Sequence, residues 1–261
     1  MTSRPQAAAA PQHHLRDAVL WVRPRTPTFA GAGIAAAALA GFAGLVDGVT
    51  ENADLASYDP GITSSVADLR APALTFAAEV VSTVGSEVAI GLFTVLALAW
   101  LWFVRDRAGV LLFGATMAVA AALTLGVKHL LGRHRPPAAF VVGPVDTGYS
   151  FPSGHTLFST VFLGMVTMLV LWPRVGRTGR VAAVAAGAAG SVAMGLSRIY
   201  LGYHWMTDVV AGWVLAVAVL AAALAMSAVV RSRSGMLQRW MGRARRPHDD
   251  AEGAGDASPA R

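Results

Sequence analysis

The chain has 261 residues but no cysteine, and only one of its 21 Lys and Arg residues is a lysine, Lys128. Without cysteine, neither a disulfide nor a thiolate metal site can form. Charge is also scarce, because only 14% of the residues are charged, against about 25% in a typical soluble protein. Several stretches without charge are about twenty residues long, which is enough to cross the hydrocarbon core of a bilayer. These absences predict an integral membrane protein.

Six apolar segments are candidates for membrane spans, and each must be helical because a bilayer offers exposed backbone groups no hydrogen-bond partners. The segments are residues 28–46, 84–104, 108–130, 154–172, 181–197 and 208–230. Residues 71–83 are too interrupted to extend the second segment, and we expect them to form a short helix at the outer interface. The fold class predicted is therefore all-α, a polytopic membrane protein with six transmembrane helices.

Both ends of the chain lie outside these segments. Residues 1–27 are polar, and the first apolar run starts too late and is too long for a signal peptide, so we interpret them as a retained, disordered cytoplasmic leader. Residues 231–261 are basic, then acidic and rich in Gly, Ala and Pro, which is typical of a disordered tail. Residues 28–230 would form the membrane domain.

The distribution of charge predicts the topology. Sixteen of the 21 Lys and Arg residues precede the first span, follow the sixth, or lie between the second and third or the fourth and fifth. Both termini are therefore predicted to be cytoplasmic, and residues 131–153 and 197–207 extracytoplasmic. Although the formal net charge is +6, the basic residues flank apolar segments and form no single stripe, so nucleic acid is not an expected partner.

The first group of candidate site residues is Lys128 and Arg135, at the end of the third span. Gly132 and Pro136 indicate that the helix ends between them. An arginine fork suits bidentate binding of phosphate oxygens, while a lysine acts as a point charge. For these two residues alone, ordinary interface residues that extend their charges to water are an equally good interpretation.

The second group is Pro152-Ser153-Gly154-His155, before the fourth span. Proline and serine are typical of a helix start, where free backbone amides attract anions. Gly154 permits close approach of a ligand to the backbone, and His155 lies in the first turn, where it can act as a proton donor. Taken alone, this segment is more often a simple helix cap.

The third group is Arg198, His204 and Asp208. His204 and Asp208 are one helical turn apart, so their side chains can touch. A carboxylate bound to one imidazole nitrogen fixes the tautomer and leaves the other nitrogen free for attack. An isolated pair of this kind is more often structural than catalytic.

Together the three groups resemble the type 2 phosphatidic acid phosphatase superfamily, which includes membrane lipid phosphatases and vanadium haloperoxidases. Its motifs are Lys-x6-Arg-Pro, Pro-Ser-Gly-His and Ser-Arg-x5-His-x3-Asp. They occur here without departure, and in the family order, at residues 128–136, 152–155 and 197–208. The resemblance implies the helical core shared by these phosphatases and haloperoxidases.

The resemblance also implies roles for individual residues. His204 corresponds to the nucleophile that forms a phosphohistidine, Asp208 orients it, and His155 is the acid and then the base. The residues that would hold the phosphoryl group are Lys128, Arg135, Ser153, Gly154 and Arg198. No metal ion or other cofactor is expected, because cations take the place of metal and no carboxylate cluster suited to Mg²⁺ is visible.

Other polar residues near the motifs have no matching role. His129, His134, Asp146 and Tyr203 are expected at loop positions or behind the site. Glu87, in the second span, is left open between the site cavity and a neighbouring helix.

The expected function is that of a membrane lipid phosphatase with its site at the outer face. Undecaprenyl diphosphate is the first substrate choice, followed by phosphatidylglycerophosphate or phosphatidic acid, or a polyprenyl-phosphoribose phosphate. The bilayer and a lipid phosphate are the expected partners, and no obligate protein partner is evident. Two alternatives stay open: a vanadate-dependent haloperoxidase, and a non-catalytic lipid-phosphate binder or transporter, which would keep its function after His204→Ala.

Overall fold

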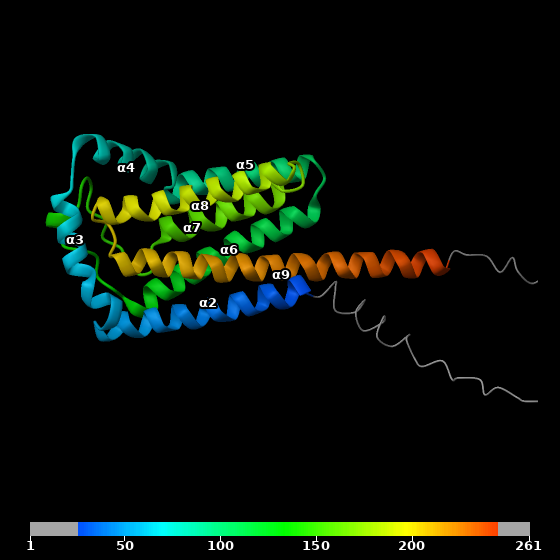
Figure 1. Ribbon diagram of the computed structural model, residues 1–261, viewed down its shortest axis with the longest axis horizontal. Coiled ribbons are helices and arrows are strands. Elements are labelled where there is room, and N and C mark those ends of the chain that lie inside the picture. The colour runs from blue at the N-terminus through cyan, green and yellow to red at the C-terminus, as the bar shows by residue number, and fades with distance from the viewer. Residues whose placement is uncertain (1–25, 245–261) are drawn as a thin grey trace, which may run out of the picture.

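The computed structural model describes residues 26–244, with side chains described for residues 28–230. All regular structure in this part of the chain is helical (Figure 1). In chain order the elements are α2 (Thr26–Glu51), the 3₁₀ helix η1 (Asp54–Tyr58), α3 (Asp59–Asp68), α4 (Pro72–Val84), α5 (Glu87–Phe103), α6 (Arg107–Leu131), the 3₁₀ helix η2 (Ala138–Phe140), α7 (Gly154–Met165), the π-helix η3 (Val166–Leu171), α8 (Arg177–Tyr200) and α9 (Met206–Ala244). The expected all-α membrane fold is confirmed.

The membrane-spanning elements match the six segments predicted, with different ends. Five spans qualify by length and apolarity, formed by α2, α6, α7 with η3, α8 and α9. The pair α4 and α5 qualifies together and is bent by 47° at its break. The predicted short helix over 71–83 is α4, and the bent pair α4–α5 has the form of a broken span or of a re-entrant loop. The helix α9 continues past residue 230, where the tail was expected to begin, as far as Ala244; most of the expected leader and tail lie outside the described residues.

Local sequence explains where the helices around the site begin and end. Ser86 caps α5 by accepting a hydrogen bond from the amide of Ala89, and Ser153 caps α7 in the same way. Such side-chain acceptors satisfy amides that have no partner inside the helix. At the other end of α6, Gly132 has φ +58° and donates its amide to the carbonyl of Lys128 at 3.0 Å. This left-handed conformation suits glycine, and it ends α6 where the sequence predicted.

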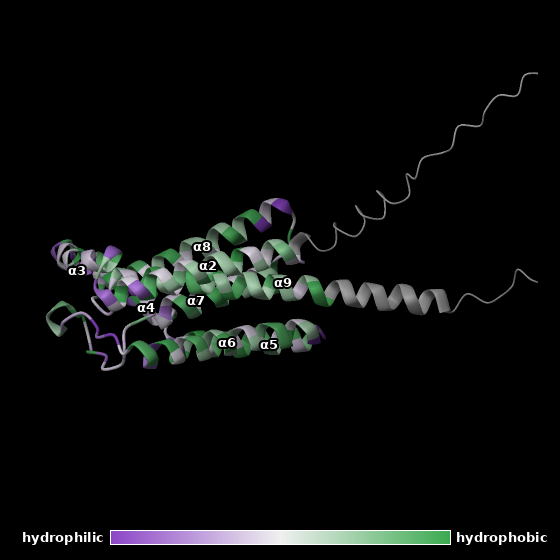
Figure 2. Cartoon of the chain, turned by 90° about the horizontal axis from the view of Figure 1, so that it is seen from below, coloured by the Kyte–Doolittle hydropathy of each residue, from purple (hydrophilic) through white to green (hydrophobic). Residues whose placement is uncertain are grey.

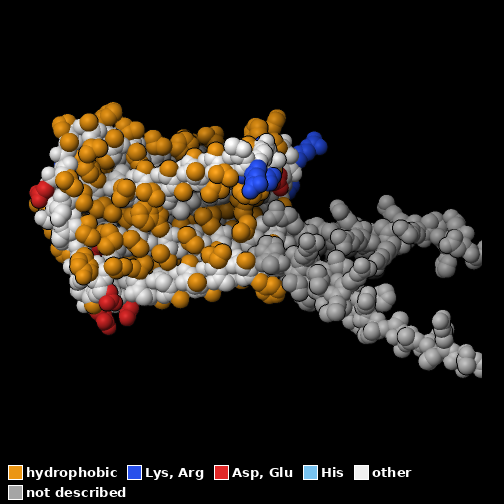
Figure 3. Space-filling view, viewed as in Figure 1, with side chains coloured by type: hydrophobic (Ala, Val, Ile, Leu, Met, Phe, Trp, Pro, Cys, Tyr) orange, Lys and Arg blue, Asp and Glu red, His pale blue; other side chains and the backbone are white. Residues whose placement is uncertain are grey.

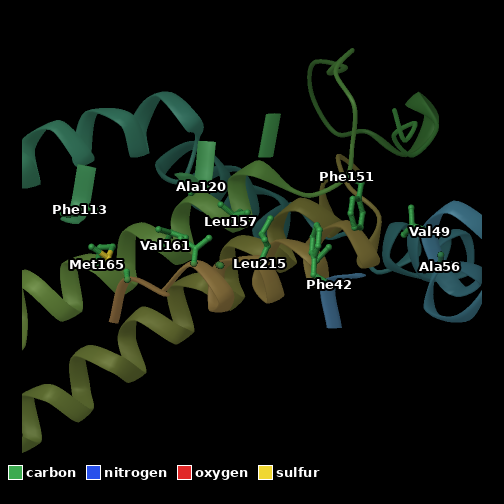
Figure 4. Packing of buried hydrophobic residues seen from close by; sticks show 14 of the residues in the cluster. Phe42, Val49, Ala56, Phe113, Ala120, Phe151, Leu157, Val161, Met165 and Leu215 are labelled. Carbon is green, nitrogen blue, oxygen red and sulfur yellow. The ribbon is translucent and has the colours of Figure 1, made fainter. Parts of the chain in front are cut away.

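The core is centred on α7 and α9 (Figure 4). Leu157, Val161 and Met165 of α7 are fully buried against α9 residues such as Leu215. Phe151, which directly precedes the second motif, is also fully buried, and its ring centroid lies 5.7 Å from that of Phe42 in α2. The loop that enters α7 is therefore held in place by the core.

The surface has the pattern of a membrane protein. Hydrophobic side chains cover the sides of the bundle, and polar residues gather toward its ends (Figures 2 and 3). Acidic side chains appear at the end that contains α3, and Lys and Arg side chains at the opposite end (Figure 3). At this basic end, Arg107 lies 3.3 Å from the ring centroid of Trp102, and Arg180 lies 4.9 Å from that of Trp172. Such aromatic and basic residues are typical of a membrane–water interface.

Candidate active site

The three motifs meet at the end of the bundle where α3 lies (Figure 1). The Arg135 guanidinium donates to the carbonyl of Tyr203 at 2.8 Å, which joins the loop after α6 to the turn between α8 and α9. The amide of Ser153 donates to the carbonyl of Asp208 at 3.0 Å, which joins the start of α7 to the first turn of α9. Segments far apart in the sequence therefore form one site.

His204 and Asp208 form a buried pair at the centre of this site. Their exposed fractions are 1% and 0%, and Nδ1 of His204 lies 3.3 Å from Oδ2 of Asp208. The same Oδ2 accepts the amide of Trp205 at 2.9 Å. On the other edge of the ring, Nε2 lies 3.2 Å from Nη1 of Arg135. Because Asp208 is an acceptor and Arg135 a donor, the arrangement assigns the proton to Nδ1 and the free electron pair to Nε2.

The protonation of His204 follows from its burial. Burial lowers the pKa of His204 from 6.5 to about 4, although Asp208 acts to raise it. The imidazole is therefore neutral at pH 7, with Nε2 available as a nucleophile.

Arg135 is held by several partners besides His204. Its Nε donates to the carbonyl of Gly148 at 2.8 Å, and its Nη2 lies 2.6 Å from the carboxylate of Asp146. Burial acts to raise the pKa of Asp146, but the amide of Gly148 and the charge of Arg135 outweigh it and hold that pKa below its usual value. Asp146, expected at a loop position, therefore orients one of the proposed phosphate-binding cations.

Arg198 is buried, with an exposed fraction of 5%. Its Nη1 donates to Oγ of Ser82 in α4 at 2.5 Å, and its guanidinium carbon lies 4.1 Å from the ring centroid of Tyr203. Among the described residues, no carboxylate forms an ion pair with it, and its Nε has no hydrogen-bond partner. A buried, unpaired guanidinium is costly unless an anion compensates it.

Lys128 and His155 lie within electrostatic range of the same cluster. The charges of Arg135, Glu87, Asp146 and Asp208 act on Lys128. His155 in turn is influenced by Arg198, His204, Lys128 and Arg135. The structure thus brings together every residue that the sequence analysis assigned to the site.

The start of α7 contributes Ser153 and Gly154. The buried hydroxyl of Ser153 accepts hydrogen bonds from the hydroxyl of Thr156 at 3.0 Å and from its amide at 3.5 Å, so its own proton can be donated to a ligand. A Cβ on Gly154 would lie 2.6 Å from Oε1 of Glu87. Glu87 therefore faces the site, which resolves the alternative that the sequence left open.

Sequence reasoning missed Arg133 and Asp59 as part of this site. Arg133 Nη1 lies 2.5 Å from Oδ1 of Asp208, and its Nη2 lies 2.7 Å from Oδ2 of Asp59 in α3. The exposed fraction of Asp59 is only 1%. Asp59 is one of five acidic residues within residues 47–68, and no local pattern separates it from the others. Arg133 stands two residues before Arg135, which is the one sequence signal that could have drawn attention to it.

The remaining polar residues lie around the site. The His129 ring packs edge-on against Tyr149, with centroids 5.7 Å apart, and the carbonyl of His134 accepts the indole N–H of Trp205 at 2.9 Å. Within the described residues, no group of three or more His, Cys, Asp or Glu side chains is arranged to hold a metal ion.

The fold and these contacts define a multi-pass helical membrane protein with a buried His–Asp pair beside four cations. Residues 109–232, which contain all three motifs, match the family model described as the PAP2 superfamily. This part of the chain is similar to that superfamily, and the resemblance noted in the sequence is confirmed.

Comparison with individual proteins agrees with this assignment. The chain is 33% identical over 110 residues to the undecaprenyl-diphosphatase of Sulfolobus acidocaldarius, covering 39% of this chain and 49% of that protein. It is 26% identical over 161 residues to the phosphatidylglycerophosphatase B of Bacillus subtilis, covering 61% of this chain and 78% of that protein. The chain thus spans about half the length of the Sulfolobus relative.

A solved structure shares the fold. The crystal structure of a transmembrane PAP2 type phosphatidylglycerolphosphate phosphatase from Bacillus subtilis superposes with a TM-score of 0.62 at 22% identity, covering 74% of this chain and 94% of that one. At this identity the likeness concerns the arrangement of helices alone.

Proposed function

We propose that this protein is a membrane lipid phosphatase that hydrolyses a phosphoester or diphosphate bond of a lipid head group at the extracytoplasmic face. The observation that carries the proposal is the buried guanidinium of Arg198, which lacks a carboxylate partner within residues 28–230 and lies in one cluster with Arg135, Lys128 and the His204–Asp208 pair. A tetrahedral oxyanion is the chemical group that such a cluster stabilises.

In the first step, Nε2 of His204 attacks the phosphorus atom. The N–P bond forms as the bond between phosphorus and the leaving oxygen breaks, and His155 transfers a proton to that oxygen. Asp208 stabilises the positive charge that develops on the ring. The product lipid leaves, and a phosphohistidine remains on the enzyme.

In the second step, His155, now neutral, takes a proton from a water molecule. The water oxygen attacks phosphorus, the N–P bond breaks and inorganic phosphate is released, which restores His204. This return to the starting protonation states makes the cycle balanced.

The cations supply the charge stabilisation that phosphoryl transfer requires above all. Lys128, Arg135 and Arg198 neutralise the phosphoryl oxygens, and the first-turn amides of α7 assist them because a helix N-terminus favours anions. We therefore propose that turnover requires no divalent metal.

For the substrate, we propose a polyprenyl diphosphate such as undecaprenyl diphosphate. The name of the Sulfolobus relative supports this choice. Phosphatidylglycerophosphate is the second candidate, favoured by the name of the Bacillus relative, of which the chain covers a larger share.

The test is phosphate release in detergent with EDTA present. Undecaprenyl diphosphate, phosphatidylglycerophosphate and phosphatidic acid are compared with the wild type and with His204→Ala. Release that is unaffected by EDTA and absent in the variant supports the proposal, and the fastest substrate identifies the lipid. Release that persists in His204→Ala contradicts the phosphohistidine mechanism, and no release from any of the three contradicts the proposed substrates.

A further inference from the structure

A buried ion-pair network lies behind the His204–Asp208 pair. The guanidinium of Arg133 bridges two carboxylates, Oδ1 of Asp208 at 2.5 Å and Oδ2 of Asp59 at 2.7 Å. Its Nη1 also donates to the hydroxyl of Thr207 at 2.8 Å. Arg133 occupies one of the unspecified positions of the first motif, and Asp59 lies outside all three motifs.

The two oxygens of Asp208 have separate partners. Oδ2 faces Nδ1 of His204 and accepts the amide of Trp205, whereas Oδ1 faces Arg133. Since Asp208 is completely buried, its ionised form needs a compensating charge. Arg133 supplies that charge at the oxygen that His204 does not use, so it fixes the plane of the carboxylate without competing for the histidine.

Asp59 forms an ion pair with the other terminal nitrogen of the guanidinium, Nη2. Its Oδ1 accepts the amide of Thr207 at 3.0 Å, and its Oδ2 also accepts the Thr207 hydroxyl. The carboxylate therefore ties α3 to the first turn of α9, directly beside Asp208. Arg133 is therefore shared between two carboxylates and does not pair with Asp208 alone.

Arg133 does not belong to the phosphate-binding group. It and Asp59 line a cavity of about 450 Å³ together with Leu131, His134 and Trp205. None of Lys128, Arg135, Arg198, His155 and His204 lines this cavity. The partly exposed side of Arg133 therefore faces away from the proposed phosphoryl site.

We propose that Arg133 is a positioning residue of the phosphatase reaction that acts through Asp208, and that Asp59 of α3 orients Arg133. This inference rests on the proposed function. By this proposal α3, which lies between the first two spans, contributes to the reaction through Asp59.

The charged groups around the pair decide the expected pH behaviour. Arg133 acts on Asp208, Arg135 and Arg198 act on His204, and Lys128 and Asp146 lie within electrostatic range. Removing only Arg133 takes away the one cation bonded to Asp208. The His204–Asp208 pair then takes up a proton more readily, so the acid limb of the kcat/KM curve is expected to move to higher pH.

The experiment compares Arg133→Gln, Arg133→Lys and Asp59→Asn with the wild type. Arg133→Gln is expected to lower kcat/KM by about 10- to 100-fold, as for other groups that orient a functional side chain by a hydrogen bond. It is also expected to move the acid limb of the kcat/KM curve to higher pH. Arg133→Lys keeps the charge but cannot bridge two carboxylates. Its acid limb is therefore expected at the same pH as in the wild type, while its kcat/KM is expected to lie between those of the wild type and Arg133→Gln. Asp59→Asn is expected to reduce kcat more than it changes KM.

A matched control is Arg70→Gln, which also removes a partly buried arginine at this end of the bundle. Arg70 donates to the carbonyls of Tyr200 and Phe140 and contacts no carboxylate of the site. It is expected to lower the thermal unfolding temperature without moving the acid limb. Loss of activity in Arg133→Gln by the same factor at every pH would overturn the inference, as would unchanged activity.

Orthovanadate binding separates this inference from the proposed function, because it needs no turnover. Vanadate mimics the trigonal arrangement around phosphorus, so its binding would report on the proposed phosphoryl site. Arg133→Gln is expected to bind vanadate more weakly than the wild type does, and the pH dependence of its vanadate affinity is expected to move to higher pH. If Arg133→Gln and the wild type bind vanadate with the same affinity at every pH, the inference is overturned. If the wild type hydrolyses no lipid phosphate but Arg133→Gln shows the vanadate effect, the proposed function fails, while the influence of Arg133 on the His204–Asp208 pair is still established.

Discussion

Nη1 of Arg135 lies 3.2 Å from Nε2 of His204, on the edge of the ring that does not face Asp208. The proposed nucleophile and one of the proposed phosphate-binding cations are therefore already in hydrogen-bond contact. The same guanidinium is fixed by Asp146 and by the carbonyl of Gly148. An incoming phosphoryl group would take over this bond from the imidazole, so that binding of the anion frees the nitrogen that attacks it.

This contact predicts that Arg135→Lys is strongly impaired. Lysine keeps the charge but cannot contact Asp146, Gly148 and a phosphoryl oxygen at once. We expect kcat/KM to fall by about 10- to 100-fold, the range of one or two charge-assisted hydrogen bonds. Phosphate release measures it, with Arg107→Lys at the opposite end of the bundle as the control. Activity of Arg135→Lys equal to that of the control would contradict the assignment.

The low pKa of His204 predicts how stability depends on pH. Burial lowers this pKa from 6.5 to about 4, so between these values the unfolded chain binds more protons than the folded one. Stability is therefore expected to fall as the pH drops from 6.5 toward 4. The measurement is the thermal unfolding temperature against pH for the wild type and for His204→Gln, which cannot titrate. Parallel curves would show that the folded protein does not lower this pKa.

The contact between Gly154 and Glu87 predicts coupled effects. A Cβ at residue 154 would lie 2.6 Å from Oε1 of Glu87 and 3.4 Å from the Phe158 ring, so Gly154→Ala must displace the glutamate. We expect Gly154→Ala to lower kcat/KM, and to lower it less when Glu87 is also changed to Ala. The double-mutant cycle is expected to give a coupling of about 1 kcal/mol. Strictly additive effects would show that the two residues do not touch.

Gly202 predicts a large effect on stability. It lies in the turn before His204 with φ +76°, and a Cβ there would lie 1.9 Å from the carbonyl oxygen of Phe140. Because that obstacle is backbone, Gly202→Ala is expected to cost about 2 kcal/mol or more. The matched control is Gly61→Ala in α3, where a Cβ meets nothing within 4 Å and which helix propensity favours. Thermal unfolding in detergent is the measurement, and equal unfolding temperatures for the two variants would contradict the prediction.

The orientation of the site in the membrane is open to direct labelling, since the chain has no native cysteine. Thr147 and Arg177 are both exposed and lie in segments predicted on opposite sides. Thr147→Cys is expected to react with an impermeant thiol reagent added from outside intact cells, whereas Arg177→Cys reacts only after lysis. The reverse pattern would place the site in the cytoplasm.

The sequence predicted most of what depends on local order. Local signals predict the end of α6 at Gly132 and the start of α7 at Ser153. The contact between His204 and Asp208 follows from their spacing of one helical turn. The break between α4 and α5 was anticipated only in part, as a short helix separate from the span. The contacts of Arg133, Asp59 and Ser82 depend on how distant helices pack, and no periodicity in a single segment encodes such pairings. Nor did any local signal distinguish Asp59 from the other acidic residues of its loop.

A main-chain hydrogen bond joins the second motif to the third. The amide of Ser153 is bonded to the carbonyl of Asp208 at 3.0 Å, so α7 and α9 are joined by main chain at the reaction centre. Ser82 of α4 and Glu87 of α5 reach the same centre by side chains alone. The bond between Ser153 and Asp208 uses no side chain, so substitutions that preserve the backbone keep it, whereas the contacts of Ser82 and Glu87 are lost when those side chains are replaced.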